Sequence, residues 1–290
     1  MSRNMESKQN LMKQVGNYLI KLGDQLGSGR FGTVYSGYHK THRVPLAIKQ
    51  ISIKVPSHEL ENLKIIIEDE LDRMKPLFTN EHIVKIIDKA ISVNNLYLIS
   101  EYCEGDSLEM IKNQDLKINE ILKIMKQTVE TMAFAHAHKT IHRDLKPDNI
   151  LFHNEIVKIS DFGLVDLVEK EETKKKIISK KGCPIYMAPE LFYDQQFDEK
   201  CDVWSLGIIF YELIYKRLPW NGKSATDLFD NNIQKMKLRF PKNEYDDEGI
   251  KDLIGKMLKV ERKERISLED VMEHEVFQRN LKTKKNRKIN

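Results

Sequence analysis

The chain reads Ile141-His142-Arg143-Asp144-Leu145-Lys146-Pro147-Asp148-Asn149 near its centre, and this stretch decides the fold. It gathers a carboxylate (Asp144), an ammonium (Lys146) and a carboxamide (Asn149) in one short segment that also holds a proline. Apolar residues flank the segment on both sides. A soluble protein rarely places three such polar groups between apolar stretches without a use for them, so we interpret the segment as a functional loop.

A second acid follows shortly after this loop. The strand-like run Ile156-Val157-Lys158-Ile159 leads to Asp161-Phe162-Gly163, which places a carboxylate on a glycine turn. Two acids and an amide suggest Mg²⁺ and an activated hydroxyl, because hard cations take carboxylate and carbonyl oxygens as ligands.

These motifs resemble those of a eukaryotic protein kinase. His142-Arg143-Asp144-Leu145 with Asn149 is similar to the catalytic loop, and Asp161-Phe162-Gly163 is similar to the magnesium motif. The resemblance implies that Asp144 is the base that accepts the proton of the substrate hydroxyl, and that Lys146 neutralises the γ-phosphate of ATP. It also implies that Asn149 and Asp161 bind Mg²⁺.

The composition of the chain limits the classes of protein to which it can belong. The chain has 290 residues, of which 40% are hydrophobic and 32% charged, and a net charge of +4. This balance is too mild to indicate nucleic-acid binding, and no apolar run is long enough for a membrane span. The three cysteines are odd in number and widely spaced, which is typical of reduced thiols inside the cell. We therefore expect a cytoplasmic or nuclear protein, and a monomer.

The glycine-rich segment Gly27-Ser28-Gly29-Arg30-Phe31-Gly32-Thr33-Val34 is a candidate phosphate-binding loop. Glycines at these spacings let backbone N–H groups approach phosphate oxygens. Alone, the pattern is more often only a tight turn. Strand-forming residues follow it, whereas a dinucleotide-binding loop should open a helix. We therefore expect a hairpin that covers ATP, with Gly27, Ser28, Gly29, Arg30, Phe31, Gly32 and Val34 at the nucleotide.

A lysine and a glutamate complete this half of the site. In Ala47-Ile48-Lys49 the lysine stands where the family's phosphate-binding lysine lies, although an isolated strand lysine more often points to water. Apolar residues at helical spacing follow from Ser57 to Met74. By resemblance, Glu70 on this helix is the partner of Lys49, with Glu68 as the alternative. Ala47 would contact adenine.

The resemblance also implies a hinge at Glu101-Tyr102-Cys103-Glu104, whose backbone would hydrogen-bond adenine. Its register makes Ser100 the gatekeeper, and this small side chain predicts an enlarged back pocket unless neighbouring side chains fill it. Glu101, Cys103 and Leu151 belong to the expected nucleotide site. Asp106 or Ser107 would contact the ribose, and Ser107 is our choice.

Residues 161–190 are charged and irregular in sequence, and end in Ala188-Pro189-Glu190, which is similar to the end of the family's activation segment. Arg143 could pair with a phosphate on this segment. Ser179, or alternatively Thr173, stands where the phosphorylation site often lies, to be modified by an upstream kinase or by trans-autophosphorylation. Cys183 replaces the threonine usual in serine/threonine kinases. We expect Cys183→Thr to retain or raise activity.

The C-terminal half continues the resemblance. Asp202 to Ile214 is similar to the family's central helix, and Arg265 matches the arginine that pairs with the segment's glutamate, here Glu190. We expect a helix over Asn119–Ala137. His136 and His138 on it match no catalytic position, so they are expected to be packing or surface residues.

Together these observations predict an α+β protein with the two-lobed kinase fold, a β-rich N-lobe with one main helix and a mainly helical C-lobe. The predicted parts are an N-terminal extension (1–17), an N-lobe (18–100), a hinge (101–104), a C-lobe (105–277) and a basic tail (278–290). ATP and Mg²⁺ would lie between the lobes. The expected substrates are proteins, phosphorylated on serine or threonine, because Lys146-Pro147 is typical of serine/threonine kinases and not of tyrosine kinases.

Two other functions remain open. A pseudokinase scaffold that only binds nucleotide is disfavoured, because such proteins generally lack one or more of the functional residues that this chain retains: Lys49, Glu70, Asp144, Asn149 and Asp161. A small-molecule kinase is disfavoured by Ala188-Pro189-Glu190, which shapes a peptide-binding surface in the family. Within protein kinases, the chain has a weaker resemblance to the autophagy-initiating group and a comparable one to calcium/calmodulin-dependent-type kinases.

Overall fold

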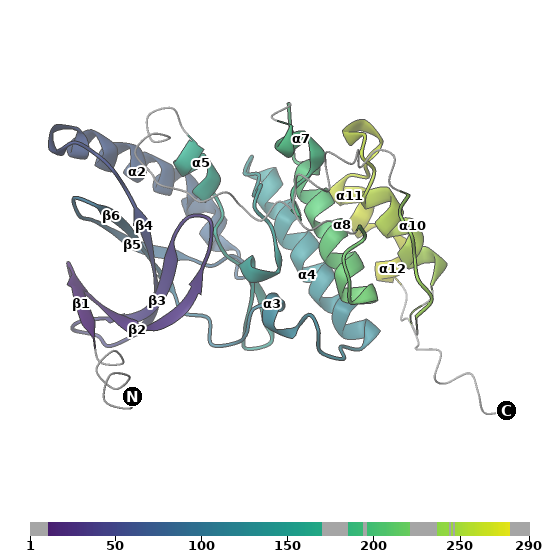
Figure 1. The fold of residues 1–290 in the computed structure, drawn as a ribbon, viewed down its shortest axis with the longest axis horizontal. Coiled ribbons are helices and arrows are strands. Elements are labelled where there is room, and N and C mark those ends of the chain that lie inside the picture. Colours follow the sequence, from purple (N-terminus) through teal and green to yellow (C-terminus); the bar gives the residue numbers. More distant parts are fainter. Residues whose placement is uncertain are drawn as a thin grey trace. The chain divides into compact units, whose positions relative to one another are not determined.

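The computed structural model describes residues 11–169, 185–193, 196–220, 237–243, 245 and 247–278. These residues form two compact units, and the chain first passes from one to the other between Glu104 and Gly105. Residues 11–104 and 163–169 belong to the first unit, and the remaining described residues to the second. Figure 1 shows the elements of each unit. No helix among the described residues is long and apolar enough to cross a membrane.

The first unit is built on a six-stranded antiparallel sheet in the order β1-β2-β3-β4-β6-β5, which Figure 1 shows as strongly curled. Its strands are β1 (Met12–Val15), β2 (Tyr18–Ser28), β3 (Thr33–His39), β4 (Pro45–Ser52), β5 (Ile86–Ile91) and β6 (Asn95–Glu101). The helices are α2 (Leu60–Met74) and α5 (Leu164–Glu169), with 3₁₀ turns at Ser57–Glu59 and Lys75–Thr79.

The two faces of this sheet bury different cores, because side chains alternate along each strand. Ile51 and Leu98 pack with α2 and α5 on one face. Ile48 and Ile99 pack with Tyr97 on the other face. The sheet therefore has one face covered by helices and a second, smaller core on its opposite face.

The second unit is mainly helical. Its helices are α3 (Leu108–Ile111), α4 (Ile118–Ala137), α7 (Pro189–Phe192), α8 (Lys200–Tyr215), α10 (Glu248–Met257), α11 (Leu268–Met272) and α12 (Glu275–Gln278). A two-stranded sheet, β7 (Ile150–His153) with β8 (Ile156–Ile159), and 3₁₀ turns at Pro147–Asn149 and Arg262–Glu264 complete it. Helix α8 is buried from Cys201 to Tyr215 and contacts α4 and α10, so it forms the centre of this unit. The predicted fold class is confirmed.

The structure differs from the predictions at three places. Residues Met12–Val15 form a strand paired with β2, whereas residues 1–17 were predicted to be an extension before the N-lobe. Helix α2 begins at Leu60, after a 3₁₀ turn. Residues 164–169 form the helix α5 and belong to the first unit, whereas an irregular segment of the C-lobe was expected. Burial of Leu164, Val165 and Leu167 explains this helix, because short helices depend on packing.

Candidate active site

The glycine-rich segment forms the turn between β2 and β3, as expected for a hairpin. Gly29 N donates to Gly32 O at 2.9 Å and closes the turn. Gly32 has a φ of +152°, and a Cβ atom there would lie 2.1 Å from Gln50 O, so only glycine fits. Phe31, at the tip of the turn, is directed inward and is almost completely buried.

Strand register places four of the predicted nucleotide residues on one face of the sheet. Val34 is the direct cross-strand partner of Lys49, and Ala47 that of Ser100. Ala47 and Lys49 are two residues apart on β4, so their side chains point to the same face. This face also carries Ile51 and is the one that the helices cover. From the resemblance, we expect ATP to bind on this face.

Burial distinguishes the two candidate partners of Lys49. Glu70 on α2 is buried, with its Oε2 3.6 Å from Arg73 Nη1. Glu68 is more than half exposed and forms an ion pair with Lys89 of β5. Lys49 itself is buried, with its Nζ 5.6 Å from the centroid of the Phe31 ring. Of the two acids, only Glu70 is buried in the first unit as Lys49 is.

The predicted hinge residues end the first unit. Glu101 is tied to the segment before β5, because its backbone N–H donates to Lys85 O at 3.1 Å and its Oε1 accepts from Lys85 N at 2.8 Å. Cys103 is half-buried. The segment after the hinge pairs with β7, where Ser107 and Leu151 form a β-bridge. The structure thus brings two predicted nucleotide residues together in the second unit.

The catalytic loop holds its three polar groups close together. Asp144 and Asn149 are buried, and Lys146 is nearly so. Lys146 Nζ lies 3.8 Å from Asp144 Oδ2, and Asn149 Nδ2 donates to Asp144 O at 2.8 Å. The second bond fixes the orientation of the carboxamide. Asp144, Lys146 and Asn149 therefore form one preorganised cluster.

Asp161 is placed beside this loop through its neighbour, Ser160. Ser160 N donates to Asn149 O at 2.9 Å, and His142 Nε2 donates to Ser160 O at 2.9 Å. The His142 ring also meets the ring of Phe162 edge to face, with centroids 4.8 Å apart. Asp161 lies between these anchored residues and has a φ of +68°, a conformation uncommon for a non-glycine residue.

Asp202, at the start of α8, anchors the backbone of the catalytic loop. Its carboxylate accepts from the backbone N–H groups of His142 and Arg143, each at 2.9 Å, and from His136 Nε2 at 2.8 Å. Burial raises the pKa of Asp202, but the hydrogen bond and charge of His136 and those of His142 lower it, and the net pKa is below its usual value. The fully buried carboxylate is therefore held ionised.

Sequence reasoning did not assign this role to Asp202 or to His136. We expected His136 to be a satisfied packing or surface histidine, and its ring is hydrogen-bonded to the anchoring carboxylate. Its neighbour His138 is exposed and hydrogen-bonds only the backbone of its own helix, at Phe134 O. The sequence offered one indication of this role, which was that His136 lies shortly before the catalytic loop. That position alone does not show which residue His136 contacts.

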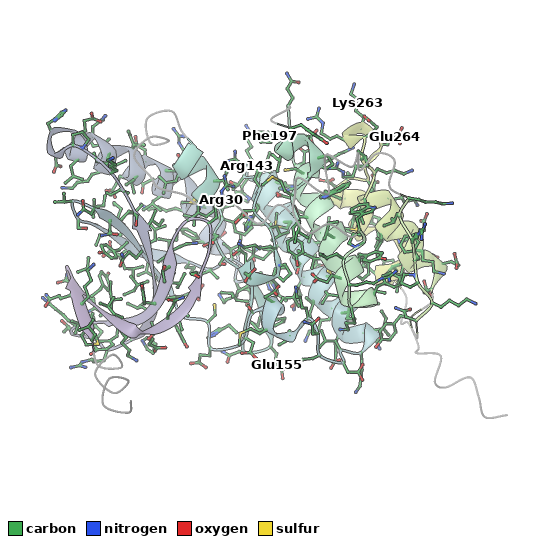
Figure 2. The ribbon with its side chains drawn as sticks, viewed as in Figure 1. Arg30, Arg143, Glu155, Phe197, Lys263 and Glu264 are labelled. Atoms are coloured by element: carbon green, nitrogen blue, oxygen red, sulfur yellow. The ribbon has the colours of Figure 1, made fainter. Side chains whose placement is uncertain are left out.

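Arg143 presents its guanidinium to an aromatic ring of the second unit. Its Cζ lies 5.3 Å from the centroid of the Phe197 ring, and Figure 2 shows the two side chains next to each other. Phe197 is itself partly exposed. The Arg143 side chain is half-buried.

The end of the activation segment is fixed by two buried networks. The predicted pair is confirmed: Arg265 donates to Glu190 from Nη1 at 2.7 Å and from Nη2 at 3.1 Å. Tyr186 OH donates to Glu212 at 2.7 Å, and Lys112 Nζ donates to the other oxygen of Glu212 at 2.8 Å. Burial lowers the pKa of Lys112, but hydrogen bonds to Glu109 and Glu212 outweigh this effect and raise it.

Three residues with predicted roles lie outside the described part of the chain. They are Thr173, Ser179 and Cys183. Residues 279–290 of the predicted basic tail (278–290) lie outside it as well.

Comparison with known proteins gives one consistent result. The protein kinase domain profile matches residues 20–277. The chain is 31% identical over 270 residues to "Serine/threonine-protein kinase ATG1b" of Arabidopsis thaliana, covering 90% of this chain and 36% of that protein. It is 33% identical over 267 residues to "Carbon catabolite-derepressing protein kinase" of Candida glabrata, covering 91% and 42%.

A third relative shows that the similarity is not confined to one group of kinases. "Calcium-dependent protein kinase 5" of Plasmodium falciparum is 31% identical over 265 residues, covering 88% of this chain and 44% of that protein. The chain spans less than half the length of these curated relatives.

Proposed function

Because this chain belongs to the protein kinase domain family, we propose that it is a serine/threonine protein kinase. It transfers the γ-phosphoryl group of ATP to serine or threonine hydroxyls of protein substrates. The relatives that it matches are named as serine/threonine or other protein kinases. The preorganised cluster of Asp144, Lys146 and Asn149 is the observation that carries the proposal.

The chemistry follows from this cluster. Asp144 accepts the proton of the attacking hydroxyl and orients it, and the nearby Lys146 meets negative charge that develops on the γ-phosphoryl group. Phosphoryl transfer depends mainly on positioning and charge stabilisation, so the fixed geometry of this loop matters more than the strength of the base. Asp202 preserves that geometry by holding the loop backbone.

The oxygen donors fit a magnesium ion. Asn149 has its amide nitrogen engaged with Asp144 O, which leaves a carbonyl oxygen as the ligand, and Asp161 supplies a carboxylate. Mg²⁺ prefers such hard oxygen ligands and commonly takes only one or two from the protein. When bound, the ion neutralises phosphate charge. Lys49, Glu70 and the glycine-rich loop of the first unit are proposed to bind the remaining phosphates.

We further propose that phosphorylation activates the enzyme. Arg143, whose guanidinium lies over the Phe197 ring, is proposed to pair with a phosphate, and such charge-assisted bonds can order a segment. Ser179 and then Thr173 are the proposed acceptors, modified by an upstream kinase or in trans by a second copy. Mass spectrometry that finds fully active protein unmodified at both positions would exclude this mode of activation.

The principal alternative is a nucleotide-binding scaffold without catalysis. The experiment that separates the two measures ³³P transfer from ATP·Mg²⁺ to a degenerate Ser/Thr/Tyr peptide library. Transfer to serine or threonine that disappears in Asp144→Asn supports the kinase. If a sample phosphorylated at Ser179 binds nucleotide and transfers no phosphate to any peptide, the scaffold is correct.

A further inference from the structure

A groove in the second unit lies between α4 and the two short helices α11 and α12. Its volume is about 200 Å³, and its apolar lining comes from Val129 of α4, Met272 of α11 and Phe277 of α12. Val129 is almost completely buried, whereas Met272 and Phe277 are half-buried. The residues of the candidate active site do not line this groove, so it is a second concave surface of the same unit.

The chain leaves α12 at the edge of the groove. Gln278, the last described residue, lines the groove, and its Nε2 donates to Met272 O at 3.4 Å. An extended chain spans at most about 3.3–3.6 Å per residue, so three further residues cover about 10 Å. Residues 279–290, which we call the basic segment, are therefore close enough to the groove to bind in it.

The rim of the groove is acidic. Glu130 and Glu273 line it, and both are exposed. Glu269 is also exposed and lies four residues before Glu273, on the same side of α11. Lys126 is the cation at the rim, with its Nζ 3.9 Å from Glu130 Oε1. An exposed ion pair of this kind is weak, and the acids at the rim outnumber the cation.

The basic segment has the composition that this groove would bind. It holds six Lys and Arg residues and no acid, and its apolar residues are Leu281 and Ile289. Leu281 is the apolar residue nearer to Gln278, and Lys282 follows it directly. An apolar side chain among cations complements an apolar groove with an acidic rim in both shape and charge.

We propose that the basic segment is the ligand of this groove, with Leu281 on the apolar lining and its cations at the acidic rim. The proposal assigns a binding site that takes no part in phosphoryl transfer, so it does not depend on the proposed function. Because the segment is joined to Gln278, its effective concentration at the groove is in the range of about 1 mM. While it is bound, the groove is closed to basic segments of other proteins.

This arrangement predicts competition with a free peptide of the same sequence. If the peptide binds only molecules whose groove is open, its observed Kd equals its intrinsic Kd divided by the fraction of such molecules. A chain whose own basic segment cannot bind must therefore bind the peptide more tightly than the wild type. Salt should weaken the binding, because it screens charges at an exposed rim.

The test uses the full chain, the variant Leu281→Asp and a fluorescein-labelled peptide of residues 279–290. Aspartate replaces the apolar anchor and is repelled by the acidic rim. Fluorescence anisotropy gives the Kd of the peptide, and circular dichroism verifies folding. If the basic segment occupies the groove in about nine of ten wild-type molecules, Kd is about ten-fold lower for Leu281→Asp. A labelled peptide that carries the same substitution should bind neither protein.

Glu273→Lys and Glu264→Lys, each introduced into the Leu281→Asp chain, test whether the groove is the binding site. Both acids are exposed and belong to the second unit. Figure 2 shows Glu264 away from the position of α12 in Figure 1. Glu273→Lys should raise the Kd of the peptide at least about three-fold, because it reverses a charge at the rim. Glu264→Lys should leave the Kd unchanged.

Three results would overturn the proposal. Equal Kd values for the wild type and Leu281→Asp would show that the basic segment does not occupy the groove of its own chain. Equal weakening by Glu273→Lys and Glu264→Lys would show that the peptide responds to net charge and not to this groove. Absence of peptide binding by every protein at low salt would show that the groove has a different ligand.

Discussion

His136 Nε2 lies 2.8 Å from Asp202 Oδ2, although 66 residues separate the two in the sequence. The same carboxylate accepts from the backbone of His142 and Arg143. A histidine on α4 therefore helps to position the catalytic loop through a carboxylate on α8, without touching the proposed reacting groups.

Replacing His136 by alanine should lower kcat at least about ten-fold and leave KM for ATP nearly unchanged, because small displacements of a catalytic group are costly. His138→Ala is the control, since His138 bonds only its own helix. Steady-state kinetics of both variants, with circular dichroism to verify folding, make the comparison. Equal losses in kcat for the two variants would show that His136 has no positioning role.

The same variant should change the pH dependence of stability. The folded pKa of Asp202 is lowered, so its contribution is present above the unfolded pKa and is lost as the pH falls through the folded value. Without His136 the pKa of Asp202 rises, because a hydrogen bond and a charge that lower it are lost. Urea unfolding of His136→Ala from pH 8 down to pH 4 should thus show destabilisation beginning at a higher pH than in the wild type.

Arg265 and Glu190 form a buried pair whose two members should depend strongly on each other. Arg265→Met leaves Glu190 buried without its cation, which costs about 3–5 kcal/mol for such pairs. Arg265→Met with Glu190→Leu replaces both charges and should recover much of the loss. Chemical denaturation of the wild type, the two single variants Arg265→Met and Glu190→Leu, and the double variant measures this. Additive losses in the double variant would mean that the pair contributes no coupling energy.

Tyr18 should make the first unit sensitive to alkali. Burial and the hydrogen bond to Asp88, at 2.6 Å, raise the pKa of Tyr18 to about 12. Because this folded pKa lies above the unfolded value, the stabilisation is complete below about pH 10 and is lost as pH rises toward 12. Tyr18→Phe should be less stable than wild type by about 1 kcal/mol at pH 8.

The difference between Tyr18→Phe and wild type should shrink between pH 10 and 12, measured by urea unfolding at each pH. Tyr35→Phe serves as the control, because it changes a tyrosine of the same sheet that is not bonded to Asp88. A constant difference across this pH range would show that the Tyr18 hydroxyl is not the titrating group.

Local patterns allowed much of this molecule to be predicted from its sequence. Asp144, Lys146 and Asn149 lie in one short loop, so their proximity needed no knowledge of the fold. Helix α4 follows from its apolar period, and its observed start is within one residue of the prediction. The Arg265–Glu190 pair was expected only through resemblance to the family, since nothing local joins those residues.

What the sequence did not indicate depends on contacts between distant segments. The strand β1 has only four residues, and its pairing with β2 is decided by tertiary structure and not by propensity. The helix α5 has its apolar residues in a charged stretch, and it forms because α2 offers a buried surface. The residues next to His136 in the sequence give no indication of its contact with Asp202, because this contact is formed only by the fold.

Ser100 as gatekeeper gives a prediction about ligand selectivity. It lies opposite Ala47 on the sheet face expected to bind adenine, and both side chains are small. An ATP-site inhibitor with a bulky aryl group should lose potency on Ser100→Met, because the larger side chain fills the space that the aryl group needs. Equal potency on both proteins, measured as inhibition of peptide phosphorylation, would show that no such space exists.

Glu70 and Glu68 offer the sharpest test of the first unit, because they are two residues apart on α2 and differ in burial. Glu70 is buried in the unit that holds Lys49, whereas Glu68 is exposed and paired with Lys89. Glu70→Gln should lower kcat/KM by about 10²-fold or more, since a misplaced Lys49 cannot position the phosphates. Glu68→Gln should change it less than about two-fold, because exposed ion pairs contribute little. Steady-state phosphorylation of one peptide by both variants measures the two changes in kcat/KM. A larger loss of kcat/KM in Glu68→Gln would assign the role of lysine partner to Glu68.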